Sequence, residues 1–111
     1  MMFEVISKLD KNVRLTEIQW KHISERHKEF NKNQIPKIIE TLKNPDFVLF
    51  STVENNYHYY KLFRKTPVTT KYLLAVVKHL NGEGFIITIF FVQNIRKEGK
   101  VVVYEKDINS V

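Results

Sequence analysis

The sequence contains no cysteine, which excludes disulfide bonds, thiolate nucleophiles and zinc sites built from cysteine. Only three glycines and three prolines occur in 111 residues, so a long linker or a disordered chain is not expected. No apolar run approaches the roughly 20 residues that a membrane-spanning helix needs, and the first residues lack the charge pattern of a signal peptide. We therefore expect a cytoplasmic protein with a single domain over residues 1–111.

Acidic residues are also scarce in the second half of the chain. Residues 1–56 hold nine Lys or Arg against eight Asp or Glu, whereas residues 57–111 hold nine against four, which accounts for most of the net charge of +6. Between Asn55 and Gly82 there is no acidic residue, and the cations are Lys61, Arg64, Lys65, Lys71 and Lys78. Such a surface favours an acidic partner such as nucleic acid, although a solvated basic face is the other interpretation.

Two helices are expected in the first half. Thr16 and Gln19 have the spacing of a capping box, and apolar residues at helical spacing predict a helix from about Glu17 to Phe30. A second apolar stripe, with Pro36 in its first turn, predicts a helix that ends before Asn44-Pro45.

After Pro45 the pattern is typical of strands, over residues 47–51, 57–64, 72–79, 85–93 and 101–105. A further short strand is expected to end at residues 13–15, and Asn81-Gly82-Glu83-Gly84 is typical of a hairpin turn. The predicted fold is α+β, with two N-terminal helices packed on one face of a four- to five-stranded antiparallel sheet.

His27 lies on the apolar stripe of the first predicted helix, so it is either a satisfied core residue or an acid/base group at the edge of a pocket. Arg26, beside it, is either a fixed charge for a phosphate or a surface cation paired with a neighbouring Glu.

In the strand 57–64, alternation places Lys61 among tyrosines on one face, and His58, Tyr60 and Arg64 on the other. If the helices cover the first face, the Lys61 ammonium must reach a pocket; if they do not, aromatic rings and cations form a stacking surface for RNA bases. Thr88 is the one hydroxyl in the strand 85–93, and it becomes a phosphate-binding candidate if it faces His27 and Lys61. Lys78 is a second candidate cation.

The four histidines do not pair with carboxylates at a recognisable metal-ligand spacing, and there is no glycine-rich phosphate loop, so no metal and no cofactor are expected. RNA supplies its own nucleophile, the ribose 2′-hydroxyl, and a protein then needs only a base, an acid and fixed cations. The inventory of His, Lys, Arg, Thr and Tyr is sufficient for that chemistry.

The sequence resembles the small metal-independent ribonucleases of the barnase, EndoU, colicin D and RelE-like fold, in particular their phage- and mobile-element-associated branch. The matching segments are W-K-H-I-S-E-R-H at 20–27, L-K-N-P-D at 42–46, Y-Y-K at 59–61 and G-F-I-I-T at 84–88. The resemblance implies catalytic roles for His27, Lys61 and Thr88, with Arg26 beside them. The family motif often has Pro after the R-H pair, where this chain has Lys28.

The expected function is therefore a metal-independent endoribonuclease, a toxin or defence effector that cleaves RNA by 2′-hydroxyl attack. Tyr60, His58, Arg64 and Lys78 are the expected substrate-binding residues. The expected partners are RNA, with tRNA and ribosome-bound mRNA as candidates, and an acidic inhibitor protein. The alternative is a non-catalytic RNA- or protein-binding module on the same fold, which would leave RNA intact.

Overall fold

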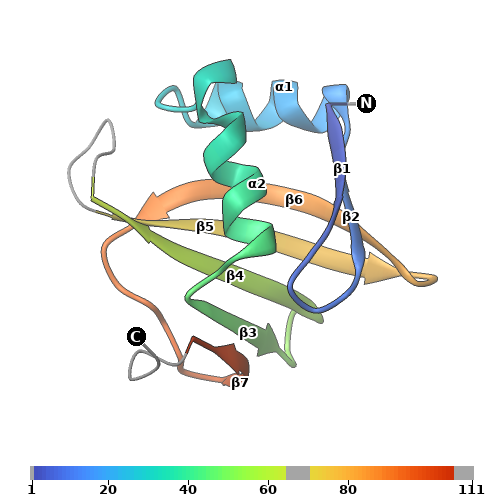
Figure 1. Ribbon diagram of the computed structural model, residues 1–111, viewed down its shortest axis with the longest axis vertical. Helices are drawn as coiled ribbons and strands as arrows, with labels where there is room; N and C mark the ends of the chain where they lie inside the picture. The colour runs from blue at the N-terminus through green and yellow to red at the C-terminus, as the bar shows by residue number, and fades with distance from the viewer. Residues whose placement is uncertain (1, 65–70, 107–111) are drawn as a thin grey trace.

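The computed structural model describes residues 2–64 and 71–106, and Lys65 of the basic segment lies outside these ranges. In chain order the elements are β1 (Phe3–Ile6), β2 (Asn12–Leu15), α1 (Glu17–Arg26), a 3-10 turn (Lys32–Gln34), α2 (Ile35–Lys43), β3 (Phe47–Ser51), β4 (Asn56–Phe63), β5 (Lys71–Leu80), β6 (Glu83–Val92) and β7 (Lys100–Glu105). Figure 1 shows the helices gathered on one side of a curved sheet.

All strands of the described ranges form one seven-stranded sheet in the order β1-β2-β6-β5-β4-β3-β7. β2 pairs with β6 in parallel, whereas the other neighbours are antiparallel. The prediction of a four- to five-stranded antiparallel sheet under two N-terminal helices is therefore wrong. β1 and β2 have only four residues each, too few for alternation to stand out, and the partner of β2 lies far along the chain.

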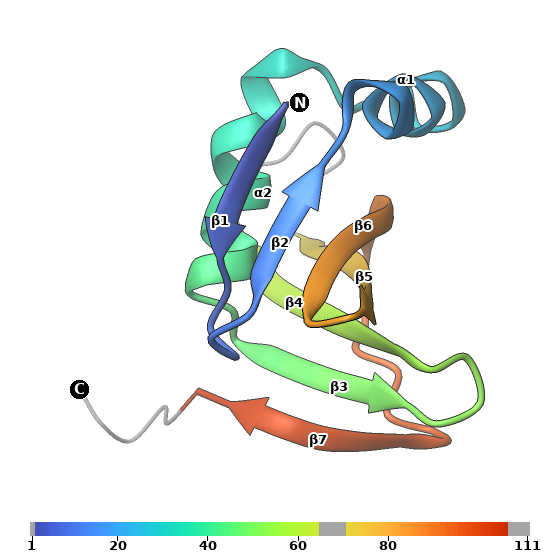
Figure 2. The same ribbon diagram turned by 90° about the vertical axis from the view of Figure 1, so that its right-hand side faces the viewer.

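The sheet is strongly twisted, as is usual for sheets of L-amino acids, so the strands at its two ends point in very different directions (Figure 2). α2 packs against one face, over β4 and β5, and also against β1. α1 lies beside β6. No helix in the described part of the chain is long and apolar enough to cross a membrane.

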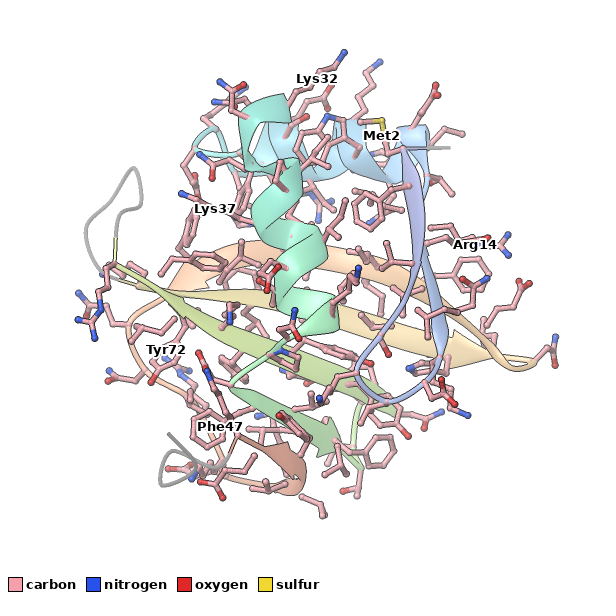
Figure 3. The ribbon with its side chains drawn as sticks, in the orientation of Figure 1. Met2, Arg14, Lys32, Lys37, Phe47 and Tyr72 are labelled. Carbon is pink, nitrogen blue, oxygen red and sulfur yellow. The ribbon has the colours of Figure 1, made fainter. Side chains whose placement is uncertain are left out.

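The start of α1 agrees with half of the capping-box prediction, because the Thr16 hydroxyl accepts a hydrogen bond from the Gln19 N–H at 3.1 Å. The Gln19 side-chain amide does not complete the box, since it donates to the Ile87 carbonyl. The helix is shorter than predicted, since it ends at Arg26 and His27 has the non-helical angles φ −123° and ψ 87°. α2 begins and ends as predicted, with Pro36 in its first turn and Asn44 as its C-cap. Lys37, labelled in Figure 3, places its Nζ 5.7 Å from the centre of the Phe63 ring.

The hairpin between β5 and β6 also agrees with the prediction. Asn81 and Gly82 have φ values of 53° and 81°, the left-handed conformation that a two-residue hairpin turn requires and that Asn and Gly adopt at low cost. This turn fixes the register of the two longest strands in the described sheet, which run beside each other over ten residues each.

Buried apolar side chains form two clusters, one on each face of the sheet. The larger cluster lies between the sheet and the helices and includes Val13, Ile38, Leu42, Tyr59 and Leu73; we call this side the helix face. The smaller cluster lies on the opposite side and consists of Leu49, Tyr60, Leu74 and Val76; we call this side the open face. Phe47 and Tyr72, labelled in Figure 3, pack against the smaller cluster from β3 and β5.

Candidate active site

A pocket of about 460 Å³ lies on the open face. Its floor is formed by side chains of the sheet, namely His58, Tyr60, Leu74, Phe90 and Val92. Its other wall comes from the connection between β6 and β7, through Gln93, Asn94 and Arg96, and from Lys100 at the start of β7. Residues of the connection therefore border this pocket together with side chains of the sheet. Figure 2 shows the chain running from the end of β6 to β7 at the other edge of the sheet.

Strand register explains which side chains meet in this pocket. Leu74 pairs with both Tyr60 and Phe90, so these three residues form a row across β4, β5 and β6 on one face. His58 and Thr88 both pair with Val76 in the next row, which belongs to the same face. The alternation of β4 thus presents His58 and Tyr60 to the pocket together, two residues apart on the strand.

His58 is buried, with 8% of its surface exposed, and Nε2 lies 2.9 Å from Asn56 Oδ1. Glu54 Oε1 is 4.0 Å from the same nitrogen, whereas Nδ1 has no hydrogen-bond partner among the described residues. Burial lowers the pKa of His58, and the positive charge of Lys100 lowers it further, against a smaller opposite effect of Glu54. The lowered pKa favours the neutral imidazole at pH 7, in which Nε2 donates to Asn56 Oδ1 and the buried Nδ1 is the basic nitrogen.

Tyr60 is 2% exposed and stands beside His58 in the pocket. Burial raises the pKa of its phenol, while a hydrogen bond from the Arg96 backbone and the positive charge of the Arg96 side chain act in the opposite direction. The hydroxyl is therefore protonated at neutral pH and available as a donor, and the nearby guanidinium is placed to stabilise negative charge on its oxygen.

The charged side chains that line the pocket are the cations Arg96 and Lys100, and among the described residues no carboxylate belongs to the lining. The same two cations border a second depression of about 410 Å³, formed by residues 95–98 and Lys100. Lys97, on this connection, places its Nζ 5.1 Å from the centre of the Phe47 ring. The β6–β7 connection thus presents a basic surface beside an imidazole and a phenol, an arrangement suited to binding a phosphate.

His27 contacts Phe90, a residue of the pocket floor. Its ring stacks on Phe90 with a centroid distance of 5.6 Å and an interplanar angle of 16°, and its Nδ1 is 3.9 Å from Glu29 Oε1. Arg26 occupies the last turn of α1 and is exposed. His27 therefore contacts a residue of the pocket, although it does not belong to the lining itself.

Lys61 and Thr88 lie on opposite faces of the sheet. The Lys61 Nζ donates to the Asn44 carbonyl at 2.8 Å, at the C-terminal end of α2, on the helix face. Thr88 lies on the open face, in the row of His58 and two strands away from it, which is about 10 Å. The structure thus does not bring His27, Lys61 and Thr88 into one cluster.

Of the four expected substrate-binding residues, two line the pocket and two lie outside it. His58 and Tyr60 line the pocket, whereas Arg64 is exposed just beyond the end of β4, and Lys78 pairs with Phe85 near the β5–β6 turn. Neither Arg64 nor Lys78 is part of the pocket lining.

Sequence reasoning missed Gln93, Asn94 and Arg96 of the connection and Lys100 at the start of β7. The signal available was a polar, basic segment between two strands, N-I-R-K-E-G-K at 94–100. A sequence does not say over which face such a segment passes. Within the described ranges, no group of three or more His, Asp or Glu side chains is arranged to hold a metal ion.

Comparison with protein-family models gives one result that bears on this site. Residues 4–105 match the model described as phage-Barnase-EndoU-ColicinE5/D-RelE like nuclease2. No curated protein and no solved structure matches the chain. The match confirms the resemblance that the helix, strand and glycine motifs indicated. This chain therefore belongs to the phage-associated nuclease family of the barnase, EndoU, colicin E5/D and RelE-like type.

Proposed function

We propose that this protein is an endoribonuclease that cleaves RNA without a metal ion, in the pocket between the open face and the β6–β7 connection. The observation that supports this most directly is the buried, neutral imidazole of His58 beside a protonated phenol and two cations. Membership of a nuclease family supports a nucleic acid as the substrate.

In the proposed reaction, His58 takes the proton of the ribose 2′-hydroxyl, and the 2′-oxygen attacks the adjacent phosphorus. The new 2′-O–P bond forms as the bond from phosphorus to the 5′-oxygen breaks, which leaves a 2′,3′-cyclic phosphate. The Tyr60 hydroxyl gives its proton to the departing 5′-oxygen, and Arg96 stabilises the phenolate that remains. Lys100 and Arg96 stabilise the negative charge on the phosphorane.

The residues expected from the resemblance take different parts in this proposal. Thr88 shares the open face with His58 and is a candidate hydrogen-bond donor to a phosphate further along the strand. His27 acts as a positioning residue behind Phe90. The electrostatic role expected of Lys61 and Arg26 belongs to Arg96 and Lys100, because the Lys61 ammonium is held at the end of α2.

The test is incubation of the purified protein with total RNA in excess EDTA, with analysis of the product ends for cyclic phosphate. We expect discrete cuts that His58→Ala and Tyr60→Phe each slow by about 10²- to 10⁴-fold, the usual contribution of a proton-transfer group. His22→Ala, on the exposed side of α1, is the matched control and should cleave like the wild type. Full activity of His58→Ala would refute the assignment.

The biological role proposed is that of a toxin or defence effector acting on cellular RNA, neutralised by an acidic inhibitor that covers the basic connection. Expression of wild type should then arrest growth, and His58→Ala should relieve it. A ribosome-programmed cleavage assay tests whether mRNA on the ribosome, rather than free RNA, is the substrate. RNA bound but left intact in both assays would favour the non-catalytic binding module.

A further inference from the structure

The proposed chemistry uses only one end of the pocket. Arg96 and Lys100 supply the positive charge and His58 the neutral base, whereas the rest of the lining comes from Leu74, Phe90 and Val92 of the sheet and from the amides of Gln93 and Asn94 of the connection. An apolar floor with an aromatic ring and a few amides at its rim does not suit a phosphate. It has the composition of a site for a flat, polar-edged ring such as a nucleobase.

We infer that this part of the pocket is a subsite that reads the base of the nucleotide whose 2′-hydroxyl is the nucleophile, with Phe90 as the stacking surface and Gln93 and Asn94 as the residues that read the base edge. This inference rests on the proposed function and adds to it a preference for one base at the cleavage position. The row Tyr60–Leu74–Phe90 spans two strand spacings, about 10 Å, which separates the base end from the charged end by roughly the extent of one nucleotide.

Phe90 is held for this role from behind. His27 stacks on it with nearly parallel rings, at 5.6 Å between centroids, so the Phe90 ring cannot turn freely. A ring that already packs against a neighbour loses little rotational freedom when a base stacks on it.

The amides indicate which base is read. An amide side chain offers one donor and one acceptor, which complement the N6 donor and N7 acceptor of adenine, whereas guanine is matched by the parallel donors of arginine. The arginine of the pocket, Arg96, has its charge beside the Tyr60 hydroxyl and is assigned to the phosphate. We therefore expect adenine on the 5′ side of the cut. The base must be unpaired, because it has to leave the stack to enter a pocket bordered by the connection.

The test uses DNA oligonucleotides that contain a single ribonucleotide, because only that position offers a 2′-hydroxyl. The wild type should cut the riboadenosine substrate at least about tenfold faster than the other three, which is the discrimination of one good amide–base pair. Gln93→Ala and Asn94→Ala should each reduce this ratio by about tenfold. Asn33→Ala, an exposed amide of the α1–α2 connection, is the matched control and should keep the ratio.

Equal cutting of all four substrates, or an unchanged ratio in both amide variants, would overturn the inference and leave the proposed ribonuclease standing. A second arm separates the two claims when no substrate is cut. Nucleoside 3′-monophosphates are titrated into the wild type and Gln93→Ala and followed by NMR at Phe90. Preferential binding of adenosine 3′-monophosphate that is lost in the variant would support the subsite, and equal binding of all four would refute it.

Discussion

At the scale of single residues, the surroundings of His58 are the most informative, because a cation and a carboxylate shift its pKa in opposite directions. Burial and Lys100 lower its pKa, and Glu54 raises it. Lys100→Met should therefore raise the pKa of His58, and Glu54→Gln should lower it further. An NMR titration of the His58 ring in the two variants measures both shifts without any assay of activity.

Lys100→Met should also shift the pH dependence of the cleavage rate. If His58 is the base, the rate rises with pH as the ring loses its proton, and the acid limb of the profile should shift to higher pH in Lys100→Met. An unchanged titration of His58 in both Lys100→Met and Glu54→Gln would show that these two charges do not act on the ring.

His79 gives a prediction about stability. Neither of its ring nitrogens has a hydrogen-bond partner among the described residues, its ring meets the Tyr57 ring edge-on at 4.7 Å, and burial, followed by the charge of Lys11, lowers its pKa. The folded protein therefore holds its protons on His58 and His79 more weakly than the unfolded chain does.

Proton linkage gives the direction in which pH changes the free energy of unfolding. The contribution of these two histidines is fully present above pH 6.5, the ordinary value, and is lost as the pH falls below it, because the unfolded chain then binds more protons. His79→Phe keeps a ring against Tyr57 and removes the titrating group. Urea unfolding between pH 5 and 7 should show a smaller fall in the free energy of unfolding for His79→Phe than for the wild type, and the exposed control His22→Gln should follow the wild type.

At the scale of elements, the parallel contact between β2 and β6 depends on Gly84. A Cβ at this position would lie 3.0 Å from Val13 Cγ2, 3.1 Å from the Asn12 carbonyl oxygen and 3.2 Å from His79 Cε1. The carbonyl belongs to the backbone of β2 and cannot move without disturbing the pairing. We expect Gly84→Ala to lower the free energy of unfolding by about 1 to 3 kcal/mol, the usual cost of overpacking, measured by chemical denaturation. Glu25→Ala, at an exposed position of α1, is the control, and an equally small effect in both would contradict this account.

The end of α1 shows why helix length was overestimated. Along β6, the pairing with β2 covers residues 83–85. α1 packs beside this strand further along, where the Gln19 amide donates to the Ile87 carbonyl. His27 then stacks on Phe90 and Phe30 stacks on Phe91. Because Phe90 and Phe91 are neighbours on a strand, they point to opposite faces, and a continuous helix cannot reach both.

At the scale of the whole molecule, the net charge of +6 predicts salt-dependent binding of RNA. The logarithm of the binding constant should fall linearly with the logarithm of the salt concentration. Arg96→Gln should reduce the steepness of this line by about 0.7, the contribution of one phosphate contact on a single strand. Lys32→Gln, which changes an exposed cation of the 3-10 turn before α2 (Figure 3), should leave the slope nearly unchanged. Equal slopes for the wild type and both variants would show that Arg96 does not contact a phosphate.

What the sequence by itself determined was local. The cap at Thr16, Pro36 in the first turn of α2, the Asn81-Gly82 turn and the five strands after Pro45 are encoded by residues close together in the chain, and the structure has them. Membership of the nuclease family was indicated by short motifs of the same local kind.

Only the tertiary structure decided which residues meet. The two faces of β4 were separated correctly by alternation, yet alternation does not say which face the helices cover or where the β6–β7 connection passes. These depend on the strand order and on pairings between distant segments, such as β2 with β6 and β3 with β7. For that reason Lys61 lies at the end of α2, whereas His58 and Tyr60 lie in the pocket with Arg96 and Lys100, which no local pattern connects to them.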